Sequence, residues 1–336
     1  MRVARRLAHA VAAAALLAPL AARADCKLRA LAEFQVDPTS RVPMVDGAVN
    51  GKPVKVMFDT GAAFSMITRH EADRLGLVLR KVEGAHAYGI GGASDLYVAE
   101  LKTLNIDKFA KRGLELAVAG DQDVASDAAI VLGDDFFSQV DAEFDLPDKV
   151  VRLLEQDGCA PDQLVYWGAA YSQAPLLTWG RDAPQIETEV FVNGKRVLAQ
   201  LDTGAWASII DGRAASAAGV DRTAPGAGPG IQIQGMGHYR RDSLVGRFAT
   251  FAMGDEKVNN VRLQVSDFSS DFRVTETGSK LPVPTDTTPS MLIGADFFHA
   301  HRVYLDVKDH LILFSYSGGP VFTPELSSVG AGPAGK

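Results

Sequence analysis

The sequence predicts a mostly β protein made of two similar lobes. The first observation is a stretch that occurs twice, an Asn-Gly pair followed by an apolar run and then by Asp-Thr-Gly-Ala. The copies begin at Asn50 and Asn193, 143 residues apart. The second is a block of two apolar residues and a Gly that also recurs, ending at Gly133 and Gly294. Matched blocks in the same order predict a duplicated fold.

Each copy of the first stretch is typical of a β-hairpin. Asn and Gly both tolerate the positive φ angles of a tight hairpin turn. The returning strands, expected over residues 54–58 and 197–201, each lead into an Asp. A carboxylate at the mouth of a buried strand is desolvated unless another group pairs with it. We therefore expect Asp59 and Asp202 to face each other across a pseudo-twofold axis.

A short strand and a short helix are expected after each Asp-Thr-Gly. The helices are predicted over residues 69–75 and 213–218. Gly76 and Gly219 should end them, because Gly readily adopts the left-handed conformation found after helices. Glycine-rich hairpins follow in both halves.

The first 24 residues have the pattern of a secretory signal peptide. Arginines precede an apolar stretch at residues 10–22, and Ala22-Arg23-Ala24 is a small-x-small cleavage site before Asp25. About 13 apolar residues are too few for the ~20 that span a bilayer. We expect export, to the periplasm of a bacterium or into the medium.

The charge of the mature chain bears on its partners. Cleavage after residue 24 removes four arginines and no acidic residue, so the net charge changes from −7 to −11. Such a surface repels nucleic acids and anionic membranes. We expect neither as a partner once the signal peptide is cleaved.

Two cysteines, Cys26 and Cys159, allow one pairing. In an oxidising compartment they can form a disulfide that ties the mature N-terminus to the segment between the lobes. Two unrelated thiols are the alternative, because the sequence does not show the distance between them.

The expected domain boundaries follow from these patterns. A signal peptide occupies residues 1–24, and the two lobes occupy residues 25–155 and 181–317. Residues 156–180 are expected to link the lobes, and the Gly/Pro/Ser-rich residues 318–336 are expected to form a disordered tail.

The repeated Asp-Thr-Gly, the glycine hairpin and the apolar-apolar-Gly block resemble those of the pepsin/retropepsin aspartic proteases, over about residues 42–316. Ala62 and Ala205 after each Gly make the pattern closer to retropepsins than to pepsins. The resemblance implies an all-β fold of two tandem retropepsin-like (acid protease) β-barrel lobes related by pseudo-twofold symmetry. Since one chain carries both lobes, we expect a monomer.

The resemblance also implies roles for the repeated residues. Asp59 and Asp202 would be the catalytic pair. The residues that support the active-site loops would be Thr60, Gly61, Thr203 and Gly204. A substrate-binding flap would be formed by Tyr88, Gly89, Ile90 and Gly91. Packing beneath the loops would involve Gly133 and Gly294.

The chemistry can also be derived from the paired carboxylates. At ~4 Å and an effective dielectric constant of ~20 they repel by ~4 kcal/mol, or about three pKa units, so they share one proton. The ionised member can activate a water, and the protonated member can donate to the scissile carbonyl oxygen. This predicts an aspartic endopeptidase of extended or unfolded polypeptides that needs no cofactor or metal.

Other readings of the sequence remain. A catalytically silent, exported peptide-binding module would have nearly the same sequence. A glycosidase needs two carboxyl groups in different environments, which the matching flanks of Asp59 and Asp202 disfavour. His299 and His301 could ligate a metal, but we expect surface or partly packed histidines. Trp206 could line a substrate pocket or belong to the core.

Overall fold

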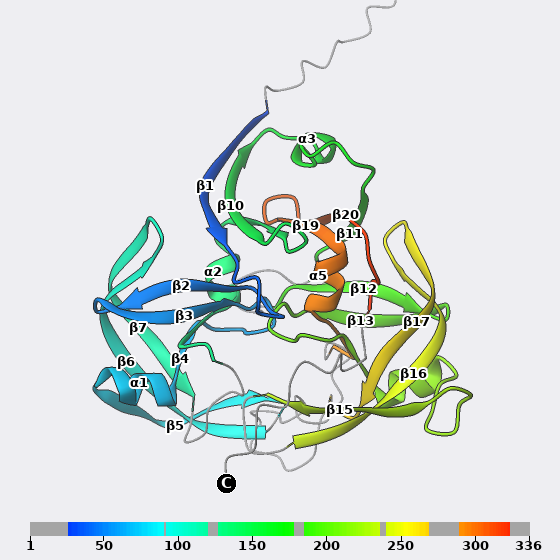
Figure 1. Ribbon diagram of the computed structural model, residues 1–336, viewed down its shortest axis with the longest axis horizontal. Coiled ribbons are helices and arrows are strands. Elements are labelled where there is room, and N and C mark those ends of the chain that lie inside the picture. Colours follow the sequence, from blue (N-terminus) through cyan, green and yellow to red (C-terminus); the bar gives the residue numbers. More distant parts are fainter. Residues whose placement is uncertain are drawn as a thin grey trace, which may run out of the picture.

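The computed structural model describes residues 26–90, 92–119, 127–177, 185–235, 240–268 and 289–322. Figure 1 shows two β lobes side by side, with a third sheet above and between them. The expected signal peptide lies outside the described residues. None of the helices in the described ranges is long and apolar enough to cross a membrane.

The N-terminal lobe is a closed barrel of six strands. β2 pairs with both β3 and β6, and this double pairing closes the ring. The strand β5 (Leu79–Gly89) extends the sheet beyond the ring as a hairpin with β6. In order around the barrel, the strands are β2 (Met44–Val49), β3 (Lys52–Phe58), β8 (Ile130–Leu132), β4 (Met66–Thr68), β7 (Phe109–Ala119) and β6 (Gly92–Ile106).

The C-terminal lobe repeats this topology. β12 pairs with both β13 and β16, and β15 (Gly228–Gln234) extends the sheet as a hairpin with β16. The two barrels confirm the predicted fold class. The strands of the second ring are β12 (Glu187–Val192), β13 (Lys195–Leu201), β18 (Met291–Ile293), β14 (Ile209–Asp211), β17 (Glu256–Ser266) and β16 (Arg240–Met253).

The Asn-Gly turns have the expected geometry. Asn50 and Gly51 have φ angles of 51° and 80°, and Asn193 and Gly194 have 49° and 73°. The side chain of Asn50 also accepts a hydrogen bond from the backbone N–H of Thr103 in β6 of the same lobe. Asn193 accepts the equivalent bond from Thr250 in β16. The backbone conformation and this side-chain hydrogen bond therefore both fix the turn before each Asp-bearing strand.

Two pairs of short helices follow the repeat. α1 (Arg69–Leu75) follows β4, and α4 (Gly212–Ala217) follows β14. The ends of both helices agree with the prediction to within one residue. Gly76 is left-handed after α1, with a φ of 72°. After the apolar-Gly blocks come α2 (Asp134–Phe137) and α5 (Ala295–Ala300).

A third sheet joins the two halves, and the sequence analysis did not predict it. Its central pair, β9 and β19, brings one strand from each half together. One edge strand is formed by residues 27–35, at the start of the expected first lobe. The expected linker contains the other edge strand, together with α3 (Pro161–Leu164). The strand order is β1 (Lys27–Gln35), β10 (Val150–Asp157), β9 (Asp141–Asp145), β19 (His301–Asp306), β20 (Leu311–Tyr316) and β11 (Ser172–Pro175).

A buried ion network holds the lobes together at this sheet. Glu143 is fully buried and accepts hydrogen bonds from Arg152 at 2.6 Å and from Arg302 of the other half at 2.9 Å. Removing one partner of such a pair leaves an uncompensated buried charge, which costs about 3–5 kcal/mol.

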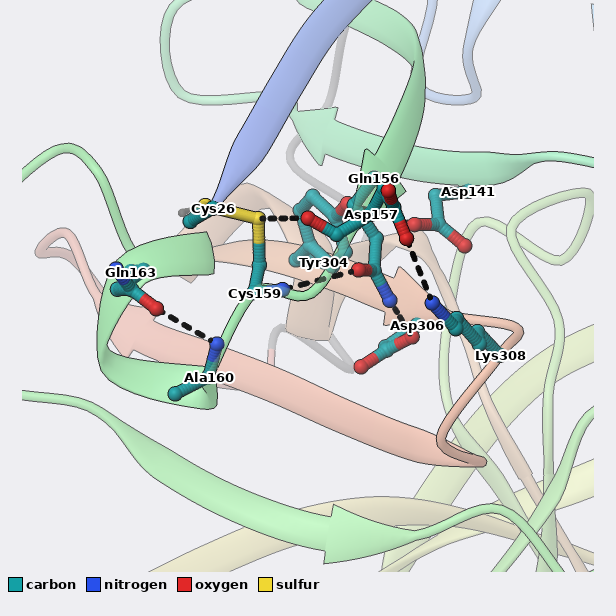
Figure 2. Close-up of a disulfide and its surroundings, with 10 residues drawn as sticks. All are labelled: Cys26, Asp141, Gln156, Asp157, Cys159, Ala160, Gln163, Tyr304, Asp306 and Lys308. Atoms are coloured by element: carbon teal, nitrogen blue, oxygen red, sulfur yellow. Dashed lines mark hydrogen bonds and ion pairs between the residues drawn. A yellow bond between two sulfur atoms is a disulfide. The ribbon is translucent and has the colours of Figure 1, made fainter. Parts of the chain in front are cut away.

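The disulfide fastens one end of the same sheet. Cys26 and Cys159 are bonded, as Figure 2 shows, and they are 133 residues apart in sequence. The bond ties the start of β1 to the turn after β10. Beside it, Gln156 donates to the Asp306 carboxylate at 3.4 Å, which links this end to the second half.

The start of the expected disordered tail is packed on the C-terminal lobe. Val321 and Phe322 are buried, and the Phe322 ring lies 4.9 Å from that of Phe251. Residues 318–322 are thus ordered by an aromatic contact, which the Gly/Pro content of the segment does not indicate. Residues 323–336 lie outside the described part of the chain.

Candidate active site

The two repeated aspartates lie between the lobes, each directly after a strand. The N–H of Asp59 donates to the carbonyl of Leu132 at 2.9 Å, and the N–H of Asp202 donates to the carbonyl of Ile293 at 2.9 Å. Each Asp therefore continues the parallel pairing of its strand with the strand of the apolar-Gly block. The same local sequence places both side chains at equivalent points.

Thr60 and Thr203 interlock the two loops. The hydroxyl of Thr60 donates to the carbonyl of Leu201 at 2.9 Å, and that of Thr203 donates to the carbonyl of Phe58 at 2.7 Å. The backbone N–H of each Thr also donates to the hydroxyl of the other, at 3.0 and 3.1 Å. Both residues are fully buried, so these crossed bonds fix the position of one loop relative to the other.

Gly61 and Gly204 let the carboxyl groups approach the opposite loops. A Cβ added to Gly61 would lie 2.3 Å from Cγ of Asp202, and one added to Gly204 would lie 2.3 Å from Cγ of Asp59. Any side chain at either position would collide with the opposite carboxyl group. The structure thus brings Asp59 and Asp202 together, as the repeat predicts.

The environment of the pair favours the protonated form. Burial raises the pKa of Asp59, although backbone N–H groups, including that of Gly61 at 2.8 Å, act in the opposite direction. Burial and then the charge of Asp59 raise the pKa of Asp202 well above its ordinary value, against the N–H of Ala205 at 2.9 Å. Two carboxyl groups in this arrangement retain one proton between them over a broad pH range.

A third carboxyl group, Asp134, lies beside the pair and was missed by sequence reasoning. It opens α2 and is only 1% exposed, and neither of its oxygens makes a hydrogen bond of good geometry among the described residues, although the backbone N–H of Ile186 acts to lower its pKa. Burial, followed by the charge of Asp59, raises the pKa of Asp134 to about 9. Its counterpart in the second half is Ala295, so the mismatch at matched positions was the available signal.

In each half, the Asp two residues after the block glycine supports the Asp-Thr-Gly loop. Asp135 accepts a hydrogen bond from the hydroxyl of Ser65 at 2.6 Å, and Ser65 accepts one from the N–H of Gly133 at 3.1 Å. In the second half, Asp296 and Ser208 make the same pair at 2.6 Å. Ser65 and Ser208 therefore donate structural hydrogen bonds to these carboxylates.

Gly133 and Gly294 pack directly under the loops. A Cβ on Gly133 would lie 2.4 Å from the carbonyl oxygen of Ala62, and one on Gly294 would lie 2.7 Å from that of Ala205. The two glycines are thus required by close backbone contact, in the place where the repeat predicts packing.

The expected flap is the β5–β6 hairpin, and its tip reaches the opposite lobe. Tyr88 and Gly89 end β5, Ile90 lies in the turn, and Gly91 is outside the described residues. A Cβ on Gly235, which follows β15, would lie 3.2 Å from Cβ of Ile90. In Figure 1 the ends of β5 and β15 approach each other below the barrels. The tips of the two hairpins are therefore in contact.

The hairpin tip at Ile90 packs against apolar side chains of the C-terminal lobe. Ile90 and Trp206, both partly buried, pack against a buried cluster that includes Ile231 and Phe268. The guanidinium of Arg41 lies 4.8 Å from the centre of the Trp206 ring. Trp206 thus lies at the edge of the cluster, beside the second Asp loop.

The histidines considered as ligands serve packing. His301 is fully buried, which differs from the surface or partly packed position expected for it. It stacks on Phe297 and lies 2.9 Å from a Glu256 carboxylate oxygen. His299 lies 2.9 Å from the carbonyl of Arg41. Within the described ranges, no three His, Cys, Asp or Glu side chains are grouped as metal ligands.

The barrels and the interlocked Asp-Thr-Gly loops define a two-lobed aspartic protease fold. Comparison with known families agrees with this assignment in both halves. Residues 45–139 match the family model described as "gag-polyprotein putative aspartyl protease", and residues 188–297 match the model "Aspartyl protease". The chain belongs to the retropepsin-like aspartic protease family, with both lobes in one polypeptide. No curated protein matches the chain significantly.

Proposed function

We propose that the protein is an aspartic endopeptidase that hydrolyses peptide bonds with a water activated by Asp59 and Asp202. One observation carries the proposal: the two carboxyl groups meet between loops interlocked by Thr60 and Thr203. Buried carboxyl groups with raised pKa values are a recurrent sign of acid–base catalysis.

The proposed reaction uses the single shared proton. The ionised carboxylate accepts a proton from the attacking water, while the protonated carboxyl donates to the carbonyl oxygen. Breakdown of the tetrahedral intermediate then breaks the C–N bond. The departing nitrogen takes a proton from the pair, and a hydroxyl of the intermediate returns a proton to the pair as the carbonyl re-forms. The dyad ends the cycle with one proton, as it began. No covalent enzyme intermediate is required.

The proposed substrate is an extended or unfolded polypeptide that lies between the dyad and the hairpin tips. Extended peptides commonly bind by adding a strand to an exposed sheet edge. An apolar cluster packs against a residue that follows each Asp-Thr-Gly, Ala62 in one half and Trp206 in the other. The first cluster contains Met44, Met57 and Met66, and Ile90 also packs against the second. This supports a preference for apolar residues around the scissile bond.

We also propose that the mature protein acts outside the cytoplasm as a monomer. The Cys26–Cys159 disulfide suits an oxidising compartment. The negative charge makes nucleic acids and anionic membranes unfavourable partners. The two aspartates on one chain support a site that needs no second copy.

Digestion of an unfolded protein by residues 25–336, from pH 3 to pH 8, tests the proposal. Asp59→Asn and Asp202→Asn should each lose cleavage while keeping the circular dichroism spectrum of the parent. Ala62→Gly serves as a matched control in the same loop and should still cleave. If the parent cleaves nothing but binds unfolded peptides, the protein is a silent binding module instead. If either Asn variant keeps the parental rate, the assigned residues are wrong.

A further inference from the structure

A groove lies on the N-terminal lobe and reaches Ser65 and Asp135 behind the first Asp loop. It has a volume of about 1680 Å³ and lies between β1 and the first part of β7. Residues 30–35 and 107–111 border it, and Leu104 and Phe136 contribute to its lining. Leu31, on one border, is 46% exposed. Neither aspartate of the dyad lines the groove.

The internal duplication identifies the equivalent place in the C-terminal lobe. Leu104 pairs with Val49 across the β2–β6 contact, and Phe251 pairs with Val192 across the β12–β16 contact. Because Val49 and Val192 each precede an Asn-Gly turn, Leu104 and Phe251 are structural counterparts. Phe136 and Phe297 are likewise counterparts, in α2 and α5.

In the C-terminal lobe this place is occupied by the chain itself. The ring of Phe322 lies 4.9 Å from that of Phe251 and 6.3 Å from that of Phe297. Val321 beside it is also buried. Residues 319–322 lie along the start of β17, which is the counterpart of the β7 border of the groove. An aliphatic–aromatic pair thus covers the apolar surface of one lobe.

The N-terminal lobe covers the same surface less completely, because Phe136 is only partly buried whereas its counterpart Phe297 is fully buried. After β20 the chain continues to Phe322, but after β10 it turns away into the disulfide at Cys159 and into α3. In Figure 1 the chain after β10 runs towards α3, away from the β6–β7 hairpin. The difference follows from the path of the chain.

The backbone on both sides of the groove can also accept a partner. β1 is an edge strand that pairs only with β10, and residues 109–116 of β7 pair only with β6 among the described strands. Unpaired strand edges readily bind an extended segment of another chain. The groove therefore offers apolar contacts in its floor and hydrogen-bonding groups at its borders.

We propose that this groove is a docking site for a short segment of another protein that presents an aliphatic–aromatic pair, as Val321–Phe322 do in the C-terminal lobe. The bulky ring would pack on the partly buried Phe136 and Phe109, and the flanking backbone would lie extended beside β1 or β7. The proposal does not depend on peptidase activity.

A labelled peptide with the sequence of residues 317–324, Ser-Gly-Gly-Pro-Val-Phe-Thr-Pro, is a suitable probe. Its binding to the folded chain is measured by fluorescence anisotropy, in the Asp59→Asn background so that the probe stays intact. A small apolar contact of this kind predicts a Kd on the order of 0.1–1 mM. Replacing Phe by Ala in the probe should weaken binding at least ~10-fold, since the ring supplies most of the buried area.

Two matched variants locate the bound probe. Leu31→Asp places a charge in the groove and should weaken binding at least ~10-fold. Leu177→Asp alters a Leu of similar exposure, 45%, outside the groove and should leave binding unchanged. Absence of binding, or binding that Leu31→Asp does not affect, would overturn the proposal. So would concentration-dependent dimerisation that Leu31→Asp abolishes, because the occupant would then be a second copy.

Discussion

Replacing Asp134 with Ala should make the protein more stable at neutral pH. The pKa of Asp134 is about 9 in the folded chain and 3.8 as its ordinary value. Between these values the unfolded chain has lost the proton while the folded chain keeps it. The free energy of unfolding of the parent therefore falls as pH rises through this window. Ala295, at the same place in the other lobe, shows that the local fold accommodates Ala.

The size of the effect follows from the width of the window. Each pH unit between the two pKa values lowers the stability of the parent by about 1.4 kcal/mol. From pH 4 to pH 7 the free energy of unfolding of the parent should fall by about 4 kcal/mol, and Asp134→Ala should not show this fall. At pH 4 the variant should be less stable by about 1 kcal/mol, because a small cavity replaces the carboxyl group. The stability curves of the two proteins should therefore cross.

Urea denaturation at pH 4, 5.5 and 7, followed by circular dichroism, measures this difference. Asp134→Asn keeps the shape of the side chain but cannot ionise, so it should show the same pH dependence as Asp134→Ala. Ala295→Asp introduces the buried carboxyl group into the second lobe and should reduce stability more at pH 7 than at pH 4. Parallel stability curves for parent and Asp134→Ala would refute the assignment of a buried neutral acid.

Three further predictions concern the loops and the disulfide. Replacing both Ala62 and Ala205 by Ser should move the acid limb of the cleavage profile to lower pH, because a hydroxyl donor stabilises the ionised pair; an unmoved limb would contradict this. Thr203→Val should destabilise the protein by about 3 kcal/mol, since it leaves a buried carbonyl and N–H of the other lobe unpaired, whereas Thr203→Ser should recover most of the urea midpoint. Replacing Cys26 and Cys159 by Ala should lower the free energy of unfolding by about 2–5 kcal/mol under non-reducing conditions. Reductant should then destabilise the parent alone.

The parts of the fold that were predictable are those set by local sequence. The Asn-Gly turns require positive φ, and α1 ends at Leu75 because the left-handed Gly76 follows it. Because the sequence repeats, the same local signals predicted the equivalent elements of the second half. It also predicted that Asp59 and Asp202 lie opposite each other, because equivalent loops must be related by the axis that relates the lobes.

The parts that were not predicted depend on long-range pairing. Apolar residues alternate along β1, at Leu28, Ala30, Ala32 and Phe34, but nothing local identifies β10 as their partner. The burial of Phe322 depends on the path of the chain after β20. Asp134 has an unremarkable local sequence, and its neutral state arises from the fold that buries it beside another carboxyl group.

The β9–β19 pairing at the centre of the third sheet has a consequence for how the cleft assembles. In a site built from two separate chains, halves joined at such a sheet dissociate on dilution. Here both strands belong to one polypeptide, so their association is intramolecular and does not depend on protein concentration. A substitution in one half therefore needs no matching substitution in the other. Asp134 and Ala295, at matched positions of the repeat, are one such difference.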